Sequence, residues 1–261
     1  MYAMERHRLI ERLVVQDGRV AVVDLAERFG VTTETVRRDL DQLERLGALR
    51  RVHGGAVAPG RTSITEQSLA ERASQRGAAK MAIAGRALDV LGEGFRGSVF
   101  LDAGTTTAAV ATLLPPRLAE TDGTAEVVTH AMPLAHSLAG SPRLSLTVVG
   151  GRVRSLTAAA VGAHTVRAIE GLRPDIAFIG TNGLTAGFGL STADPDEAAV
   201  KQAIVTAARR VVLVTDAQKF GAELLVAFAG LTDVDILVTD RAPGAELSAA
   251  LSDAGTEVWT A

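Results

Sequence analysis

The stretch that decides the fold runs from Val31 to Ala56 and reads VTTETVRRDLDQLERLGALRRVHGGA. Its first half predicts a helix, because apolar residues recur at spacings of four, three and three and so form one buried face. These residues are Val36, Leu40, Leu43 and Leu46. Thr32 is placed to cap this helix and Gly47 to end it. Two short strands joined around Gly54 and Gly55 are expected over 48–57.

The residues before this stretch predict two more helices. An amphipathic helix is expected over 4–16, ended by Gly18, and a short helix over 24–29, with a possible short strand at 19–22 between them. Gly30 supplies the positive φ of a tight turn before the third helix. This order of three helices and a hairpin is typical of the winged helix-turn-helix, whose last helix enters the major groove of DNA.

The polar face of the third helix suits base contacts. Arginine pairs bidentately with guanine, glutamate accepts from cytosine, and threonine contacts a thymine methyl or a phosphate. Arginines and a histidine in the following hairpin are expected near backbone phosphates. The predicted DNA-binding residues are Thr32, Thr33, Glu34, Thr35, Arg37, Arg38, Arg50, Arg51 and His53. The alternative is a solvated helix with ordinary ion pairs, such as Glu34 with Arg38.

Composition bounds the class of protein. A length of 261 residues suggests about two domains. Cysteine is absent, which excludes disulfides and thiolate metal sites and favours a reducing compartment. The charged start fits no signal peptide, and no apolar run approaches the roughly 18 residues of a membrane span. Residues 1–58 hold ten arginines against nine acidic residues, whereas the remainder holds 17 basic against 21 acidic residues. We expect a soluble cytoplasmic protein without membrane association.

From residue 79 onward, short apolar runs alternate with helical patterns. Strands are expected over 98–102, 126–129, 144–149, 175–179, 211–215, 235–239 and 257–259. Helices are expected over 80–91, 106–114, 131–139, 158–170, 195–209 and 243–253. Such alternation predicts an α/β fold with a mostly parallel sheet covered on both faces. The expected domains are a DNA-binding domain at 1–57, a linker and connecting helix at 58–78, and an α/β domain at 79–261.

Four loops of the α/β domain suit a ligand. Residues 102–107 follow a strand and open a helix with three threonines, where backbone N–H groups and hydroxyls form an anion cradle. The loops at 149–152 and 180–183 also follow strands, at the edge where open parallel sheets bind ligands. The fourth loop, 191–197, leads to Lys201. Purely structural roles stay open for these loops. The threonines of 102–107 are also explained by a helix cap without a ligand, the glycines of 149–152 by a tight turn, and Asp194 by the start of a helix.

Lysine is rare in this chain. Lys80, Lys201 and Lys219 stand beside 24 arginines. A sequence that mostly uses arginine retains lysine where a compact ammonium is wanted, although codon bias explains the rarity equally well. Glu197 and Lys201 are also spaced as an i,i+4 ion pair.

The N-terminal stretch resembles the DNA-binding domain of the DeoR-type family of bacterial repressors. The shared residues include the run Thr35–Leu40 and the segment His53–Ala56. The remainder resembles the effector-binding half of the same family, through Leu101–Thr107, Phe178–Gly183 and Lys219–Gly221. The start MYAMER, the histidine at position 130 and the GRVR and GLST segments resemble an actinobacterial subgroup associated with fructose or related sugar operons.

The resemblance implies a fold related to ribose-5-phosphate isomerase and CoA-transferase-like proteins. It also implies a phosphorylated sugar as effector, with Gly104–Thr107 on the phosphate. The predicted effector-binding residues are Asp102, Gly104, Thr105, Thr106, Thr107, Thr129, His130, Gly151, Arg152, Gly180, Thr181, Asn182, Asp194, Glu197, Lys201 and Lys219. His130 departs from the family's usual asparagine. It donates to a ligand hydroxyl, titrates near neutral pH, or is simply packed.

The sequence therefore predicts a transcriptional repressor that binds double-stranded operator DNA, forms a dimer or tetramer, and releases DNA when a sugar phosphate binds. No catalytic residue, metal or cofactor is expected. The rival hypothesis is a sugar-phosphate isomerase with a DNA-binding head, which needs a carboxylate base such as Asp102, Asp194 or Glu197. An activator or an RNA binder is a third hypothesis, and the scarcity of aromatic residues argues against single-stranded RNA.

Overall fold

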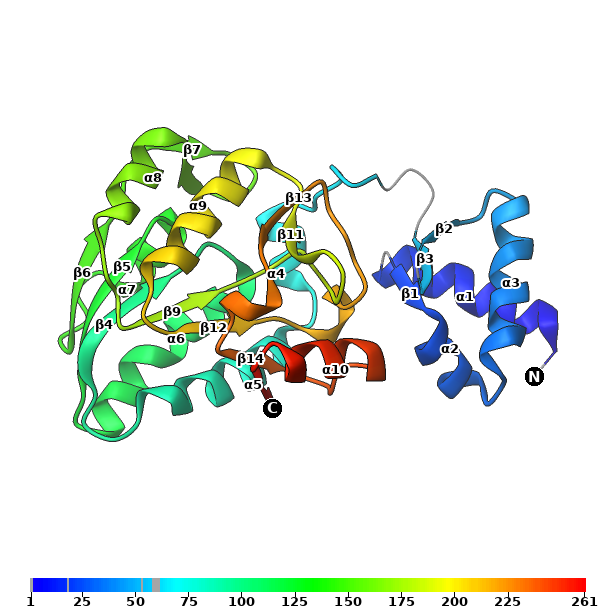
Figure 1. Ribbon diagram of the computed structural model, residues 1–261, viewed down its shortest axis with the longest axis horizontal. Coiled ribbons are helices and arrows are strands. Elements are labelled where there is room, and N and C mark those ends of the chain that lie inside the picture. Colours follow the sequence, from blue (N-terminus) through cyan, green and yellow to red (C-terminus); the bar gives the residue numbers. More distant parts are fainter. Residues whose placement is uncertain (1, 18, 53, 58–61) are drawn as a thin grey trace. The chain divides into compact units, whose positions relative to one another are not determined.

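The computed structural model describes residues 2–17, 19–52, 54–57 and 62–261 (Figure 1). It contains two compact units, Met1–Thr65 and Glu66–Ala261. Within those described ranges, no helix has both the length and the apolar character needed to cross a membrane. Gly18, His53 and the first four residues of the expected linker, 58–61, lie outside the described residues.

The N-terminal unit is a winged helix-turn-helix, as predicted. Its strands pair antiparallel in the order β1-β3-β2. Its elements are α1 (Ala3–Asp17), β1 (Arg19–Ala21), α2 (Val22–Phe29), α3 (Thr33–Arg45), β2 (Arg50–Val52) and β3 (Gly55–Val57). Gly55 must be glycine, because a Cβ atom there would lie 2.0 Å from the carbonyl oxygen of Val20 on the neighbouring strand.

The predicted signals around α3 are confirmed with one exception. Gly30 ends α2 with a φ of 63°, and the Thr32 hydroxyl accepts a hydrogen bond from the N–H of Thr35 at 3.2 Å. The inward-facing Val36, Leu40 and Leu43 are buried. The prediction that Leu46 joins this face is wrong. Leu46 is 70% exposed, because the helix ends at Arg45 and the chain turns toward the wing.

A buried ion pair joins α1 to the back of α3. The Nε and Nη2 atoms of Arg6 donate to the Asp39 carboxylate at 2.7 and 3.0 Å, and the His7 Nε2 lies 2.9 Å from the same carboxylate. Arg6 and Asp39 are both buried. The hydrogen bond to Asp39 raises the pKa of Arg6 despite its burial. This bidentate geometry fixes the rotation of α3 about its axis.

The C-terminal unit is built on a parallel sheet of seven strands in the order β15-β14-β12-β9-β4-β5-β6. The strands are β4 (Arg96–Leu101), β5 (Thr124–Thr129), β6 (Leu144–Val148), β9 (Ile176–Ile179), β12 (Val211–Val214), β14 (Ile236–Thr239) and β15 (Glu257–Thr260). Each strand corresponds to one of the runs predicted from the sequence. All six neighbouring pairs are parallel, so the predicted sheet type is confirmed.

Helices cover both faces of this sheet, as predicted (Figure 1). One core contains α5 (Gly77–Ala87), α6 (Thr105–Glu120) and α7 (Met132–Leu138), and the opposite core contains α8 (Ala163–Glu170), α9 (Pro195–Ala207) and α10 (Ala245–Asp253). Alternation along β4 illustrates the division: Val99 and Leu101 join the first core, whereas Phe100 joins the second.

Two details differ from the sequence prediction. The expected helix over 158–170 is wrong at its start, because residues 159–161 form β8 (Ala159–Val161), which pairs with β7 (Arg152–Arg154). Gly162, with a φ of 95°, then separates β8 from α8. The second difference is a small antiparallel sheet formed by β10 (Gly183–Thr185), β11 (Gly189–Thr192) and β13 (Val226–Ala229), which was not anticipated.

Removing the buried carboxylate of the N-terminal unit tests the role of the Arg6–Asp39 pair. Asp39→Ala leaves Arg6 buried without its partner, and we expect it to destabilise this unit by about 3 kcal/mol. Urea unfolding followed by circular dichroism measures the loss. The matched control is Glu27→Ala, which removes an exposed carboxylate from α2. Equal stability of the two variants would contradict a structural role for the pair.

Candidate nucleic-acid interface and anion pocket

The polar face of α3 carries the predicted base-contacting side chains. Arg37 and Arg38 are exposed, and their side chains retain 56% and 79% of their accessible surface. Glu34 lies 3.4 Å from Arg38 Nε and 3.8 Å from Arg37 Nη1. The ion pair expected from spacing alone is therefore present. Exposed ion pairs of this kind contribute little free energy. Breaking them so that Arg37 and Arg38 contact DNA would therefore cost little free energy.

The wing is braced against α3 by Arg51. Its Nη1 donates to the Asp41 carboxylate and, at 3.3 Å, to the carbonyl oxygen of Arg37. Its backbone N–H donates to Glu44 Oε1 at 2.6 Å. These contacts orient the hairpin beside α3, so Arg51 positions the wing. Arg50 on the same strand is exposed.

The threonines at the start of α3 form a local cap. The hydroxyls of Thr32 and Thr35 lie 2.9 Å apart, and Thr33 beside them is exposed. A contact between these residues and DNA stays a prediction.

The order in which successive strands join the sheet of the C-terminal unit reverses beside β4. Strands β5 and β6 follow on one side of β4, whereas β9 and β12 lie on the other. Open parallel sheets bind ligands beyond the carboxyl ends of their strands at such a point. The loops that leave β4, β9 and β12 meet there and line one pocket, together with residues from the segment that joins α4 (Leu69–Ser74) to α5.

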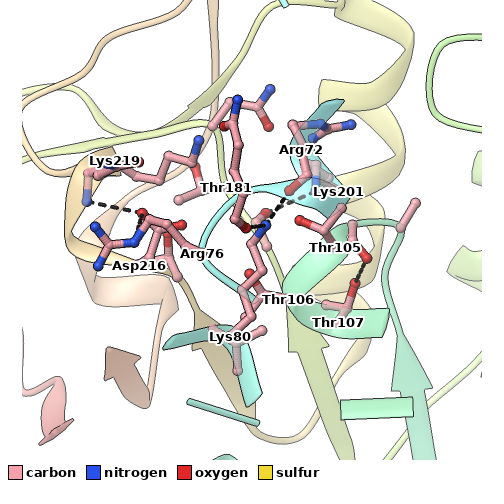
Figure 2. Close-up of a pocket in the computed structure, with 18 residues that line it drawn as sticks. Arg72, Arg76, Lys80, Thr105, Thr106, Thr107, Thr181, Lys201, Asp216 and Lys219 are labelled. Carbon is pink, nitrogen blue, oxygen red and sulfur yellow. Dashed lines mark hydrogen bonds and ion pairs between the residues drawn. The ribbon is translucent and has the colours of Figure 1, made fainter. Parts of the chain in front are cut away.

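This pocket gathers positive charge and hydroxyl groups (Figure 2). Its cationic lining residues are Arg72, Arg76, Lys80, Lys201 and Lys219, and its hydroxyl-bearing residues include Thr105, Thr106, Thr107 and Thr181. Asp216 is a lining carboxylate, and it lies 3.9 Å from Arg76 Nε. Asp240 forms a closer ion pair with Arg76. The excess of cations favours an anionic ligand.

The start of α6 adds backbone donors to the pocket. Gly104 precedes the helix, and the first intrahelical bond runs from the N–H of Ala108 to the Gly104 carbonyl. The preceding N–H groups of a helix have no acceptor within it and point along its axis toward its N-terminal end. The Thr107 hydroxyl donates to the Gly104 carbonyl at 3.0 Å, which fixes this loop. The arrangement suits a phosphate group.

Asp102 lies beneath the pocket, fully buried, and ties its loops together. Its Oδ2 accepts from the Gly180 N–H at 3.0 Å and from the Lys201 ammonium. Burial by itself would raise the pKa of Asp102, but Lys201 and a hydrogen bond with His130 outweigh burial and lower the pKa to about 2. Asp102 therefore remains an anion and neutralises Lys201.

His130 is packed under the same loop. Its Nε2 lies 3.2 Å from the backbone nitrogen of Ala103 and 3.2 Å from Asp102 Oδ1. Its Nδ1 donates to the Ala160 carbonyl at 2.8 Å. Next to it, the Thr129 hydroxyl donates to the Leu101 carbonyl at 2.7 Å. Both side chains support the pocket from below.

Among the described residues, seven of the predicted effector-binding residues do not line the pocket: Asp102, Thr129 and His130 lie beneath it, and the other four, Gly151, Arg152, Asp194 and Glu197, lie elsewhere. Gly151 and Arg152 are exposed, and Arg152 pairs with Asp196. Asp194 caps α9 by accepting the Glu197 N–H at 2.9 Å.

Glu197 and Lys201 have separate partners. The buried Glu197 carboxylate accepts from the Thr157 hydroxyl at 2.6 Å and from Arg154 at 3.1 Å. Lys201 donates to Asp102 and to the Gly180 carbonyl. The expected i,i+4 pair is therefore replaced by longer-range contacts.

Sequence reasoning missed the pocket residues Arg72, Gln75, Arg76, Lys80 and Asp216 as site residues. One signal pointed to them: all three lysines of the chain line this pocket. Lys80 is buried, and its ammonium donates to the carbonyls of Arg72 and Gln75. Burial lowers the pKa of Lys80, Asp216 opposes that change, and the neighbouring cations Lys219, Arg72 and Arg76 reinforce it.

Comparison with known proteins assigns both units. Residues 6–62 match the DeoR-like helix-turn-helix domain, and residues 75–241 match the DeoR C terminal sensor domain. The chain is 38% identical over 257 residues to the HTH-type transcriptional regulator GlpR of Haloferax volcanii, covering 98% of this chain and 96% of that protein. It is 30% identical over 253 residues to the glycerol-3-phosphate regulon repressor of Escherichia coli, covering 97% of each.

Among solved structures, ribose 5-phosphate isomerase A of Methanocaldococcus jannaschii is similar, with a TM-score of 0.39 and 18% identity over 54% of this chain and 53% of that chain. The two family matches together span most of the sequence, and the first of the two relatives matches it almost from end to end. The chain therefore belongs to the DeoR family of transcriptional regulators.

Proposed function

We propose that this protein is a cytoplasmic repressor of a sugar-utilisation operon and that a phosphorylated sugar releases it from operator DNA. The proposal rests on one observation above all. Five cationic side chains converge with the start of α6 on a single pocket at the carboxyl edge of the sheet. The same chain carries a winged helix whose α3 arginines are exposed.

The electrostatics of the pocket support a phosphate as the ligand group. The pKa of Lys80 is lowered chiefly by burial, and the neighbouring cations Lys219, Arg72 and Arg76 lower it further. A bound dianion relieves this repulsion and accepts hydrogen bonds from ammonium, guanidinium, hydroxyl and backbone groups. The E. coli relative is named for a regulon of glycerol-3-phosphate, which is itself a phosphorylated metabolite.

The positions and partners of the candidate carboxylates favour binding over isomerase chemistry. A general base must reach the substrate carbon and hold a pKa near the working pH. Asp102 lies beneath the pocket with a pKa of about 2, and Glu197 is engaged by Arg154 and Thr157. Asp216 lines the pocket beside Arg76. These carboxylates are placed to balance charge and to hold loops.

We also propose that the protein acts as a homo-oligomer, a dimer or tetramer. One winged helix reads a short half-site, and two-fold related heads read two half-sites one helical turn apart. The switch then requires that the effector bind the DNA-releasing state more tightly, with a coupling of about 1–3 kcal/mol.

Loss of an exposed α3 arginine tests the DNA interface. Arg37→Ala should weaken operator binding by about 1–3 kcal/mol, because a bidentate contact to a base is lost. Fluorescence anisotropy on operator DNA and on a scrambled duplex separates this loss from a general electrostatic effect. The scrambled duplex should show a smaller change. Unchanged preference for the operator would remove α3 from the recognition role.

A thermal-shift screen tests the ligand class. A sugar phosphate at about 100 times its Kd should stabilise the protein by about 2.7 kcal/mol, whereas the unphosphorylated sugar should not. Thr106→Val should abolish the shift, because Thr106 lines the pocket. Arg152→Gln is the matched control, since Arg152 is exposed and pairs with Asp196. If Arg152→Gln abolishes the shift and Thr106→Val does not, the ligand binds elsewhere.

A further inference from the structure

Glu66 is the first residue of the C-terminal unit and lies within the segment 58–78 that is expected to join the two domains. Its side chain is only 3% exposed. Its carboxylate lies 2.8 Å from Arg154 Nη2 and 3.5 Å from Arg72 Nη2, and it accepts a hydrogen bond from Asn182 Nδ2 at 3.3 Å. A buried carboxylate is costly unless cations surround it. These contacts therefore anchor the start of the C-terminal unit.

Arg72 stands between this anchor and the anion pocket. It lies on α4, lines the pocket and is 14% exposed. Its Nε and Nη2 atoms are buried and have no hydrogen-bond acceptor among the described residues. Glu66 is close enough to attract Arg72 but does not satisfy its donors. Unsatisfied buried donors of a charged group cost free energy, which an incoming acceptor recovers.

Two residues that line the pocket, Lys80 and Arg76, also fix the junction between α4 and α5. Lys80 donates to the carbonyls of Arg72 and Gln75 at the end of α4. Arg76 adopts the left-handed conformation, with a φ of 54°, and pairs with Asp240. A non-glycine residue in this conformation persists only where its surroundings enforce it. The segment that begins at Glu66 thus ends in groups that face the pocket (Figure 2).

We propose that an anion in the pocket competes with Glu66 for Arg72 and so loosens the anchor at the start of the C-terminal unit. This inference rests on the proposed function and specifies how a bound phosphate reaches the chain segment leading to the winged helix. A phosphate dianion offers Arg72 two acceptors in the fork geometry that guanidinium prefers. Glu66 retains its contacts with Arg154 and Asn182. Its carboxylate therefore stays paired while its attraction to Arg72 is lost.

Competition between Glu66 and the anion for Arg72 would affect both partners reciprocally. If the anion and Glu66 draw on the same guanidinium, neutralising Glu66 must tighten anion binding by the same factor by which the anion weakens the anchor. If Glu66 only repels the anion through space, its neutralisation also tightens anion binding, but the anion then leaves hydrogen exchange across residues 66–72 unchanged in the wild type. The change in affinity and the change in exchange together therefore decide between these roles.

Isothermal titration of the full chain with inorganic phosphate measures the change in affinity. We expect Glu66→Gln to bind phosphate about fivefold more tightly than wild type. Arg72→Gln should bind at least about tenfold more weakly, because it removes a charge-assisted contact. Glu71→Gln is the matched control: Glu71 is exposed on the same helix, accepts from the Ser68 N–H, and glutamine retains that cap. It should bind phosphate as wild type does.

Hydrogen exchange provides an independent readout on the wild-type chain. The Leu69 N–H donates to the Leu156 carbonyl at 3.1 Å and reports on the anchored segment. Phosphate should speed exchange across residues 66–72 in the wild type and leave Glu66→Gln unaffected. Thermal melting verifies that each variant is folded.

Three outcomes overturn the proposal. Equal or weaker phosphate binding by Glu66→Gln, or wild-type binding by Arg72→Gln, refutes the competition while leaving the anion pocket standing. Unchanged or slower exchange of residues 66–72 on phosphate addition refutes the loosening. Failure of the wild type to bind either phosphate or any sugar phosphate removes both the pocket and this mechanism.

Discussion

The buried ion pair between Asp102 and Lys201 is the contact on which the C-terminal unit's pocket depends. It joins the loop after β4 to helix α9, and Asp102 also holds the Gly180 N–H of the loop after β9. The sheet brings these loops to one edge, but the carboxylate fixes their spacing. Because Lys201 neutralises Asp102 below, the cations above remain available to attract an anion. Buried charges are tolerated here because each has a partner.

The winged helix also contains a buried ion pair that fixes its frame. Arg6 and Asp39 hold α3 from behind, so the arginines on its opposite face can remain exposed and weakly paired. In both units a buried ion pair fixes the frame, and the other cations of the proposed binding surface lie apart from that pair. That division of roles explains why a chain with a net charge of −3 can still present basic sites.

Local patterns predicted most of the framework. Seven apolar runs predicted the seven parallel strands, and the spacing of Val36, Leu40 and Leu43 predicted α3. Short strands such as β8 were missed, because alanine favours no one structure strongly enough in so few residues. Leu46 was misplaced, because spacing does not reveal where a helix ends.

The pocket was predictable only in part. The threonine loop and the 180–183 loop follow strands and were recognised from local sequence. Arg76 was missed because its ion-pair partners, Asp216 and Asp240, lie more than 100 residues away in the sequence. Arg72 was missed because the other loops that line the pocket come from distant parts of the sequence. The rarity of lysine was the one clue that reached across such distances, since Lys80, Lys201 and Lys219 meet in one place.

The central claim is that an anion in this pocket controls DNA binding. The most direct measurement is release of the full chain from an operator selected out of a random DNA pool, followed by fluorescence anisotropy. We expect release by a sugar phosphate, no release by the same sugar without its phosphate, and DNA binding without release for Lys219→Gln. Equal release by the unphosphorylated sugar, or normal release of Lys219→Gln, would contradict the central claim.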